Sequence, residues 1–375
     1  VGGTAAEVLL ELAPAQAYGV LWDGTRRLGW GDRVEGRQLR LDVGPFAVVL
    51  EQHSALRVAR QHRGWLEQIH EACLVDASEA TLGALQQLGG LKVLEGSLAG
   101  QGICGQLSDC GHNIGECSKL QELSLNFASN EVEGNLAKFG LGMARCSTLM
   151  SVKLDFEGNR ISGDLALFSH LVGSCSRLEN FDLNLRGNQI TGDLSDFGHA
   201  IGRCTKLRTL RLNVQDNKIV GEVADFGVGI AQCAKLTTLS LNAQDNKLVG
   251  ILFQFCSGLG TFAHLASLDL NFRGNRIYGN LEDLGRAISR CTALQSLSLN
   301  FQDNQIVGDM VPVARGSRCC PKLASLHINV QGTTISADGI ARAFGGACPE
   351  FCAGSIVTNQ GDVNISALMN KSSRF

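Results

Sequence analysis

The sequence predicts an α/β solenoid, and the first observation behind this prediction is a repeat of 29 residues. Residues 204–232 represent the unit well, and it recurs in register without an insertion. A fixed period of roughly 20 to 50 residues indicates stacked units that bury their apolar faces against one another. One column of the repeat is nearly all cysteine: Cys117, Cys146, Cys175, Cys204, Cys233, Phe262, Cys291 and Cys320.

Two further observations give the structure of the unit. Leu210, Leu212 and Val214 alternate with polar residues, which places the three side chains on one side of a short strand. Val223 and Phe226 begin a series at the spacing of one helical face. Equivalent strands should stack in parallel, and we predict that they begin near Leu94, Leu123, Val152, Phe181, Leu210, Leu239, Leu268, Leu297, Leu326 and Ser355.

Polar and small columns connect the strand to the helix. The column of Asn217 is predicted to be structural, because an amide can both donate to and accept from the backbone of a turn that enters the core. Gly221 frees the backbone for that turn, and Glu222 occupies the next column as a weak helix N-cap. In other repeats the same column supplies better N-caps: Asn135, Asp164, Asp193, Asn280 and Asp309.

Residues 1–75 do not follow the repeat and are predicted to form a β-rich cap with one helix. Asp23-Gly24 and Gly44-Pro45 are hairpin signals between apolar runs. A helix should begin after Ser54, with apolar positions at helical spacing as far as Cys73. We predict the solenoid over residues 76–348, in about nine repeats, and a C-terminal cap and tail over residues 349–375.

The columns of the repeat resemble leucine-rich repeats. The unit is most similar to the helix-bearing class of the ribonuclease-inhibitor type, with its roughly 28 to 29 residues. It departs from that class in having three inward strand residues before the Asn, and this L-x-L-N-x-x-x-N-x-I variant is similar to repeats of protist proteins, those of ciliates and dinoflagellates. The resemblance implies a leucine-rich-repeat solenoid with a curved parallel sheet on its concave face and helices on its convex face.

Composition narrows the function classes. The chain has 33 basic and 36 acidic residues, so its charge of -3 favours neither nucleic acid nor an anionic membrane surface. No apolar run reaches the roughly 18 to 20 residues that span a bilayer, so direct membrane insertion is not expected. Seven of the 14 cysteines occupy one column, which indicates buried, reduced thiols and an intracellular, reducing compartment.

No catalytic, cofactor-binding or metal site is predicted. Cys104, Cys110 and Cys117 lie close in sequence, but their columns point in different directions, so a zinc site is disfavoured. Cys319 and Cys348 are one period apart, and a disulfide between them is a minor alternative. Neither a Ser/His/Asp or Cys/His grouping nor a phosphate-binding glycine motif is present.

The candidate partner-binding residues lie in two places. Polar side chains on the outward side of the strands form a continuous surface that packing does not require. One of its columns, represented by Asn213, we interpret as a structural amide ladder along the sheet. The charged and imidazole candidates on this surface are Lys153, Asp182, Arg186, Arg211, Asp269, Arg273 and His327.

The second place is an irregular repeat at residues 250–262. Ile251 replaces the N-cap residue, Phe262 replaces the core cysteine, and Phe253 stands where most repeats have Ala or Ser. The segment is either a locally repacked, less helical repeat or an apolar contact for a partner on the convex face. Phe253 is therefore the apolar candidate for partner binding.

The sequence as a whole favours a non-enzymatic interaction module or scaffold that binds other proteins. The alternative is an accessory structural subunit of a large assembly, such as an organellar one. The resemblance also includes activators of small GTPases, which makes a regulator of a GTPase or another enzyme a further alternative, although no residue set carries that role over.

Overall fold

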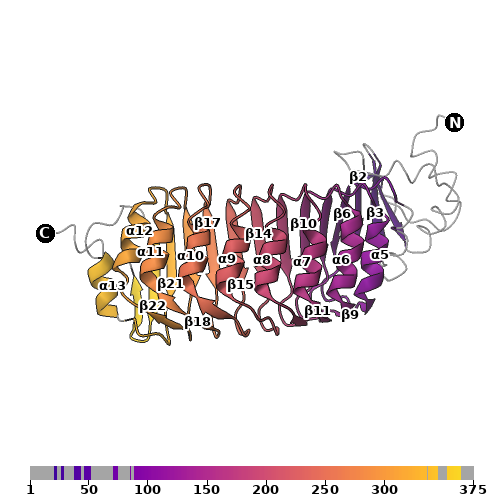
Figure 1. The fold of residues 1–375 in the computed structure, drawn as a ribbon. Helices are drawn as coiled ribbons and strands as arrows, with labels where there is room; N and C mark the ends of the chain where they lie inside the picture. Colours follow the sequence, from indigo (N-terminus) through magenta and orange to yellow (C-terminus); the bar gives the residue numbers. More distant parts are fainter. Residues whose placement is uncertain are drawn as a thin grey trace, which may run out of the picture. The chain divides into compact units, whose positions relative to one another are not determined.

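The computed structural model describes residues 21–22, 27–28, 38–43, 46–51, 71–74, 85, 88–335, 337–344 and 353–364. The chain divides into two compact units, Val1–Ser162 and Gly163–Phe375. Helices and strands alternate along both units, with the helices on one side of the strands (Figure 1).

In the first unit, the strands that carry the L-x-L pattern belong to a sheet that we call the main sheet. It is parallel from β5 to β10, and the strands before β5 pair antiparallel. The strands, in spatial order, are β2 (Arg27–Leu28), β1 (Leu21–Trp22), β4 (Phe46–Glu51), β3 (Gln38–Val43), β5 (Glu71–Leu74), β6 (Val93–Ser97), β8 (Glu122–Asn126) and β10 (Ser151–Asp155).

The N-terminal strands confirm the two predicted hairpins, β1–β2 and β3–β4. The predicted end of the cap helix is wrong, because residues up to Cys73 were assigned to it and Glu71–Leu74 form strand β5 instead. This strand pairs with both β3 and β6, so backbone pairing on two sides outweighs the local helical spacing. The remainder of that predicted helix lies outside the described residues.

In the second unit, the main sheet is parallel from β12 to β22 and ends in the antiparallel pair β22–β23. Each strand pairs with the next one repeat on, for example Leu210 with Leu239 and Asn213 with Asn242. The strands are β12 (Asn180–Asn184), β14 (Thr209–Asn213), β15 (Thr238–Asn242), β17 (Ser267–Asn271), β19 (Ser296–Asn300), β21 (Ser325–Asn329), β22 (Ala353–Thr358) and β23 (Gly361–Asn364). The predicted strand column is thus confirmed as far as Leu326, but the register shifts by one residue in β22, where Gly354 rather than Ser355 lies opposite Leu326.

One helix follows each strand of the main sheet from β6 to β21. The first unit has α5 (Leu107–Gly115) and α6 (Leu136–Arg145). The second has α7 (Leu165–Val172), α8 (Leu194–Ile201), α9 (Val223–Ile230), α10 (Leu252–Leu259), α11 (Leu281–Ile288), α12 (Val311–Arg318) and α13 (Ala337–Phe344).

Four of the predicted N-caps, Asn135, Asp164, Asp193 and Asn280, directly precede their helices, whereas Met310 rather than Asp309 directly precedes α12. The carboxylate of Asp193 accepts a hydrogen bond of 2.7 Å from the backbone N–H of Ser195, and the other predicted caps make the same contact. The side chains of Glu222 and Ile251 make no capping bond, which agrees with the prediction that Glu222 is a weak substitute. Substituting a good cap costs about 1 kcal/mol, so the two helices form mainly through packing.

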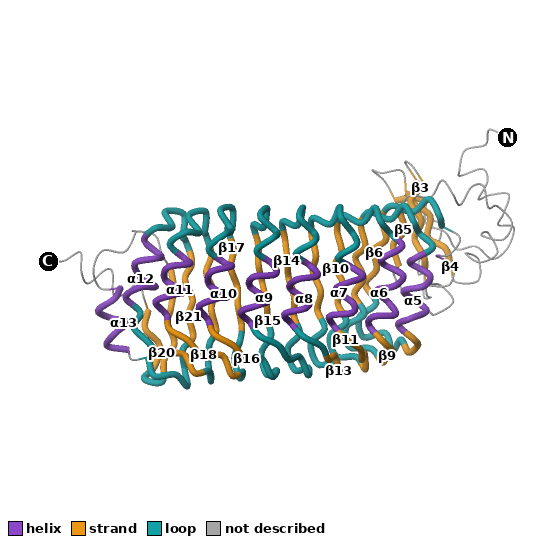
Figure 2. Tube along the Cα trace, in the orientation of Figure 1, coloured by secondary structure: helices purple, strands orange, loops and turns teal. Residues whose placement is uncertain are grey.

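In most repeats a short parallel strand of a second set lies between the main strand and its helix, along the lower edge in Figure 2; within the described residues, the repeats of α9 and α13 have none. We call them the rim strands; the sequence pattern had predicted only a turn there. Gly221 and its equivalents have positive φ, which bends the chain from the rim strand into the helix. The rim strands are β7 (Cys104–Gln106), β9 (Glu131–Asn135) and β11 (Arg160–Asp164), and β13 (Gln189–Thr191), β16 (Val249–Ile251), β18 (Arg276–Asn280) and β20 (Gln305–Val307).

The column of Asn217 connects successive repeats. The Asn217 amide donates to the carbonyls of Leu185, Val214 and Gln215 at 2.9–3.1 Å, and its oxygen accepts from the N–H of Ile190 at 2.9 Å. The buried Asn246 makes the equivalent four bonds one repeat later. The predicted structural role of this column is confirmed.

The outer column of Asn213 does not form the predicted ladder of Asn upon Asn. Each side chain accepts from the backbone N–H two residues on, as Asn242 does from Gln244. Where the preceding repeat has a glutamine at the right position, the amide donates to it, as from Asn242 to Gln215 at 3.0 Å, from Asn271 to Gln244 and from Asn329 to Gln302. The interaction runs diagonally because the Asn oxygen is already used to close its own turn.

The cysteine column is buried, as predicted. The Sγ of Cys233 lies 3.6 Å from the carbonyl oxygens of Ile201 and Cys204, and Cys320 makes the equivalent contacts at 3.4 and 3.3 Å. Phe262, which replaces a cysteine, is also fully buried. Each thiol is therefore a small apolar side chain with a weak hydrogen-bond donor.

This burial predicts a sharp difference in thiol labelling. Among the described cysteines, only Cys104 and Cys319 are exposed, so the native protein should react quickly at these two positions. In denaturant, all 14 cysteines should react with the same reagent. Mass spectrometry after brief alkylation checks the positions, and native labelling of Cys233 as fast as that of Cys104 would contradict the buried column.

Candidate functional site

The outward side of the main strands, which we call the strand face, carries the predicted charged candidates. Arg211, Lys153, Asp269 and His327 are exposed, and Asp182 is half-buried. The remaining two candidates, Arg186 and Arg273, begin the turns that follow their strands, and their side chains are 46% and 43% exposed.

Ion pairs within the chain neutralise much of this charge in the second unit. Arg211 lies 4.0 Å from Asp182 in the neighbouring strand. Arg186 and Arg273 pair with the aspartates of the following repeat, Asp216 at 3.9 Å and Asp303 at 3.8 Å. Exposed pairs of this kind contribute roughly 0 to 1 kcal/mol, so they stabilise the fold little, but they leave a balanced surface.

Two more candidates, Asp269 and His327, make side-chain hydrogen bonds to serines of neighbouring strands. Ser240 donates to the carboxylate of Asp269 at 3.1 Å, and the Nδ1 atom of His327 lies 3.2 Å from the Ser355 hydroxyl. The structure therefore does not gather the predicted charges into one site. They are distributed along the sheet, each next to a polar partner or solvent.

The irregular repeat keeps its helix, α10, and so the less helical interpretation is wrong. Phe253, in its first turn, is 46% exposed, whereas Ala224 in the same column is fully buried. Beside Phe253 is a shallow groove lined by Cys256, Ser257, Asp283, Arg286, Ala287 and Arg290. Arg286 is held by Glu282 and Asp283 at 3.1 and 3.3 Å, which leaves an apolar ring next to a largely balanced set of charges.

The rim strands β16, β18 and β20, together with Val220 at an isolated β-bridge to Asp193, carry a surface that the sequence pattern did not reveal. Val220, Val249, Tyr278 and Val307 are exactly one period apart, and their exposed fractions are 44%, 38%, 49% and 46%. We call these four side chains the apolar stripe. The column lies between the Ile219 and Gly221 columns, and its apolar character in four successive repeats was the signal that could have identified it.

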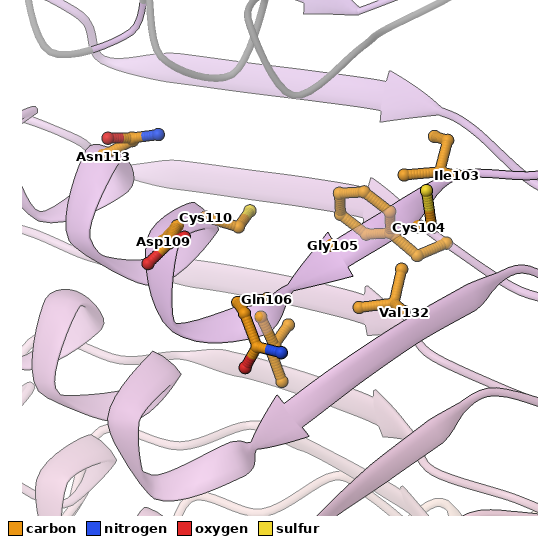
Figure 3. A pocket seen from close by; sticks show the side chains of 10 residues that line it. Ile103, Cys104, Gly105, Gln106, Asp109, Cys110, Asn113 and Val132 are labelled. Carbon is orange, nitrogen blue, oxygen red and sulfur yellow. The ribbon is translucent and has the colours of Figure 1, made fainter.

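The rim of the first unit has a small apolar pocket (Figure 3). Its lining includes Ile103, Cys104, Cys110, Phe127 and Val132. Burial raises the pKa of the Cys110 thiol to about 12, so this thiol is not a nucleophile at neutral pH. Within the described ranges, no three His, Cys, Asp or Glu side chains are arranged to hold a metal ion.

No helix in the described part of the chain is long and apolar enough to cross a bilayer.

The sheet, the helices and the 29-residue columns together identify the fold. It is a leucine-rich-repeat solenoid.

Comparison with known proteins finds similar solved structures but no related sequence. No protein-family model and no curated protein matches the sequence. An internalin (inlF) from Listeria monocytogenes is 16% identical, with 78% of this chain and 92% of that chain covered and a TM-score of 0.45. Internalin C2 of the same organism is 15% identical, with coverages of 74% and 91% and a TM-score of 0.39. A structure of the LRIM1/APL1C complex is 15% identical and gives coverages of 78% and 50% and a TM-score of 0.38.

Proposed function

We propose that this chain is a non-enzymatic protein-interaction module or scaffold, and that it binds its partner through apolar side chains outside the strand face. The observation that carries this proposal is the position of the large exposed apolar side chains. In the described part of the chain, none of them lies on a strand of the main sheet: they are Leu141, Met150, Leu167, Val220, Val228, Val249, Phe253, Tyr278 and Val307.

The energetics favour these positions as anchors. Burying an exposed aromatic side chain in an interface removes apolar area from water, and anchors of this type carry most of the binding energy in protein complexes. The arginines of the strand face would first have to lose their internal partners, such as Asp182 for Arg211. Desolvation of those charges offsets much of what new contacts would contribute.

Three finer proposals accompany this one. The repeats are a variant of the helix-bearing, ribonuclease-inhibitor-like class, which the eight-residue helix of α9 supports. The protein works in a reducing compartment, which the regular packing of the buried thiols supports. A permanent place in a larger assembly is a second candidate function, favoured by the apolar stripe across four successive repeats of the second unit.

The test compares Phe253→Ala with Arg211→Ala. The immobilised wild-type protein and the two variants are incubated with extract of the native source, and the retained proteins are quantified by mass spectrometry. We expect a partner that the wild type and Arg211→Ala retain equally and that Phe253→Ala retains about tenfold less, since an aromatic anchor contributes about 1.4 kcal/mol or more.

Circular dichroism and thermal melting control for folding, because both side chains are exposed and neither substitution should disturb the core. Loss of the partner on Arg211→Ala, with no effect of Phe253→Ala, would place the interface on the strand face and refute the proposed anchor. Retention of no specific protein by any of the three forms would refute the interaction function itself.

A further inference from the structure

The turns that join each helix of the second unit to the next main strand carry an excess of positive charge. They lie along the upper edge in Figure 2, at the opposite end of the main strands from the rim. From α7 to β21 these turns are residues 173–179, 202–208, 231–237, 260–266, 289–295 and 319–324. Glu179 is their only acidic residue. Their basic and imidazole side chains are all exposed: Arg177, Arg203, Lys206, Arg208, Lys235, His264, Arg290 and Lys322. We call this set of turns the basic edge.

The turns are hydrogen-bonded to one another in the register of the main sheet. The N–H of Arg208 donates to the carbonyl of Glu179 at 2.7 Å, and the N–H of Thr237 donates to the carbonyl of Arg208 at 2.8 Å. The same bond recurs in the next three repeats, from Ala266, Gln295 and Ala324. Each donor lies one full period after its acceptor, so the residues of one column stand one strand spacing apart, about 4.8 Å.

One column of the basic edge places positive charges in successive repeats. It lies two residues before the N–H donors just described and contains Arg177, Lys206, Lys235, His264, Ala293 and Lys322. Its first four members span three strand spacings, about 14 Å. Within the described residues, Arg177, Lys206 and Lys235 make no ion pair, whereas Arg208 in a neighbouring column lies 3.5 Å from Glu179. An anion above this column would therefore interact with several unpaired cations at once.

The helix ends account for only part of this charge. A helix C-terminus stabilises nearby cations, but the effect falls off within about one turn. Arg203 is two residues beyond the end of α8 at Ile201, which is within that range. Lys206 is five residues beyond the same end, and Lys235 is five residues beyond the end of α9 at Ile230. The fold itself gives these two lysines no counter-charge.

The strip of positive charge is narrow. On the helix side, an eight-residue helix is about 12 Å long, and its other end has acidic residues in the first turn, such as Asp196 in α8 and Asp225 in α9. On the strand side, Asp182 and Asp269 stand at the third position of their strands. A lipid surface or a nucleic-acid duplex is wider than this strip, so its phosphates would also approach these carboxylates.

The chemistry of the edge also favours a polypeptide. In these turns no large apolar or aromatic side chain is exposed, so there is none to insert into lipid and no Phe, Tyr or Trp ring to stack on a base. Arg290 belongs both to the basic edge and to the groove beside Phe253. A protein that contacts Phe253 therefore reaches the basic edge directly.

From this arrangement we infer that the basic edge of the second unit binds an acidic segment of a partner protein, with Asp and Glu side chains opposite Arg177, Lys206 and Lys235. The inference rests on the proposed interaction function and specifies the chemistry of the partner. A narrow segment covers the column without approaching the acidic starts of the helices. Exposed charge pairs of this kind determine orientation and the rate of association more than tight affinity.

A synthetic acidic peptide tests this inference with the full chain. The probe is a fluorescent peptide of about 10 residues, roughly 34 Å long when extended, in which glutamate alternates with glycine and serine. The control peptide has glutamine in place of each glutamate. At an ionic strength of about 0.1 M, where charges interact over about 10 Å, fluorescence anisotropy should show at least about tenfold tighter binding of the glutamate peptide. Binding should disappear near 1 M salt, where that range is about 3 Å.

Two double variants with the same change in charge locate the binding. Lys206→Glu with Lys235→Glu should weaken binding of the glutamate peptide at least about tenfold, because attraction becomes repulsion at two neighbouring positions. Lys218→Glu with Lys247→Glu is the matched control in the same two repeats. These exposed lysines follow the other end of their main strands, about 17 Å away along five strand residues, so binding should change less than about twofold.

Folding of both double variants is checked by circular dichroism. The neutral variant Lys206→Gln with Lys235→Gln should lose binding to an intermediate degree, and it replaces the charge reversal if that variant does not fold. Since all four lysines are exposed, we expect the native spectrum in each case.

Equal binding of the two peptides, or equal effects of the two charge-reversal variants, would overturn the inference. So would tighter binding of a single-stranded oligonucleotide or of phosphatidylserine vesicles with the same dependence on Lys206 and Lys235, since the partner would then be a nucleic acid or a lipid surface. If a native protein is retained through Phe253 while the Lys206 and Lys235 reversal changes neither its retention nor peptide binding, the inference fails and the interaction function stands. If the glutamate peptide binds at the basic edge and no native protein is retained, the interaction function is the one that fails.

Discussion

Raising the pH from about 9 to 11 is expected to unfold this protein in a cooperative transition. Burial raises the pKa of Cys117, Cys204, Cys233 and Cys320 to about 12 and that of Cys291 to about 11. In the unfolded chain a cysteine titrates near 8.5. Above that pH the unfolded state releases thiol protons that the folded state retains.

The sign follows from proton linkage. A thiol whose folded pKa is raised leaves stability unchanged below about pH 8.5, and stability then falls until the pH passes the folded pKa. Each fully protected thiol removes up to about 1.4 kcal/mol for each pH unit in that window. Several such thiols together can exceed the roughly 5 to 15 kcal/mol by which domains are usually stable.

Urea denaturation at a series of pH values between 8 and 11 measures the effect. The unfolding free energy should be flat near pH 8 and fall with increasing slope above it. The double variant Cys204→Ala and Cys233→Ala should show a smaller slope, because two of the protected thiols are gone. An unchanged slope in that variant would show that other groups cause the alkaline unfolding.

The repeat itself could be predicted from the sequence because its determinants are local and recur. Leu210 and Leu212 alternate at period two, and Asn217 follows at a fixed distance in the same unit. A side chain that repeats every 29 residues has equivalent neighbours in every repeat. A structural assignment that is ambiguous in one repeat can therefore be settled from the same position in the others. The N-caps at Asp164 and Asp193 were predictable for the same reason.

The features that sequence reasoning missed depend on pairing between repeats. A rim strand such as Val249–Ile251 has three residues and includes a glycine, so it has no strand signature of its own. It forms because its neighbours in β18 supply the hydrogen bonds. Strand β5 is a similar case, since two partners hold Glu71–Leu74 in an extended conformation.

The candidate site was predicted less well, for a different reason. The charges on the strand face could be predicted from the residue columns, but their pairing, such as Arg186 with Asp216, depends on how far a turn side chain reaches. The prediction that Phe253 departs from its column is confirmed, because its side chain is 46% exposed. The apolar stripe was missed, because its residues had been assigned to a turn. Whether the side chains of a column face solvent depends on the path of the backbone, and this path could be described only from the structure.

Asn217→Ala is expected to destabilise the protein by about 1 to 3 kcal/mol. The substitution removes one acceptor and a donor group that serves three carbonyls, and it leaves the N–H of Ile190 and the carbonyl of Leu185 without this partner. Because these groups belong to the preceding repeat, the loss also weakens the interface between two repeats, which is the main source of stability in a solenoid.

Asn213→Ala is the matched control in the same repeat. Its side-chain oxygen accepts one bond of 3.2 Å from the N–H of Gln215, and this group can turn to water on the half-exposed strand face. Its cost should therefore be clearly smaller, about 0.5 kcal/mol. Asn246→Ala, one repeat later and more deeply buried, should cost at least as much as Asn217→Ala.

Urea denaturation of the three variants, followed by circular dichroism, gives the free energies. Equal costs for Asn213→Ala and Asn217→Ala would mean that the inner column contributes no more than an ordinary turn side chain. The expected order, with Asn246→Ala and Asn217→Ala well above Asn213→Ala, requires that the inner amides join one repeat to the next, because that is the physical difference between the two columns.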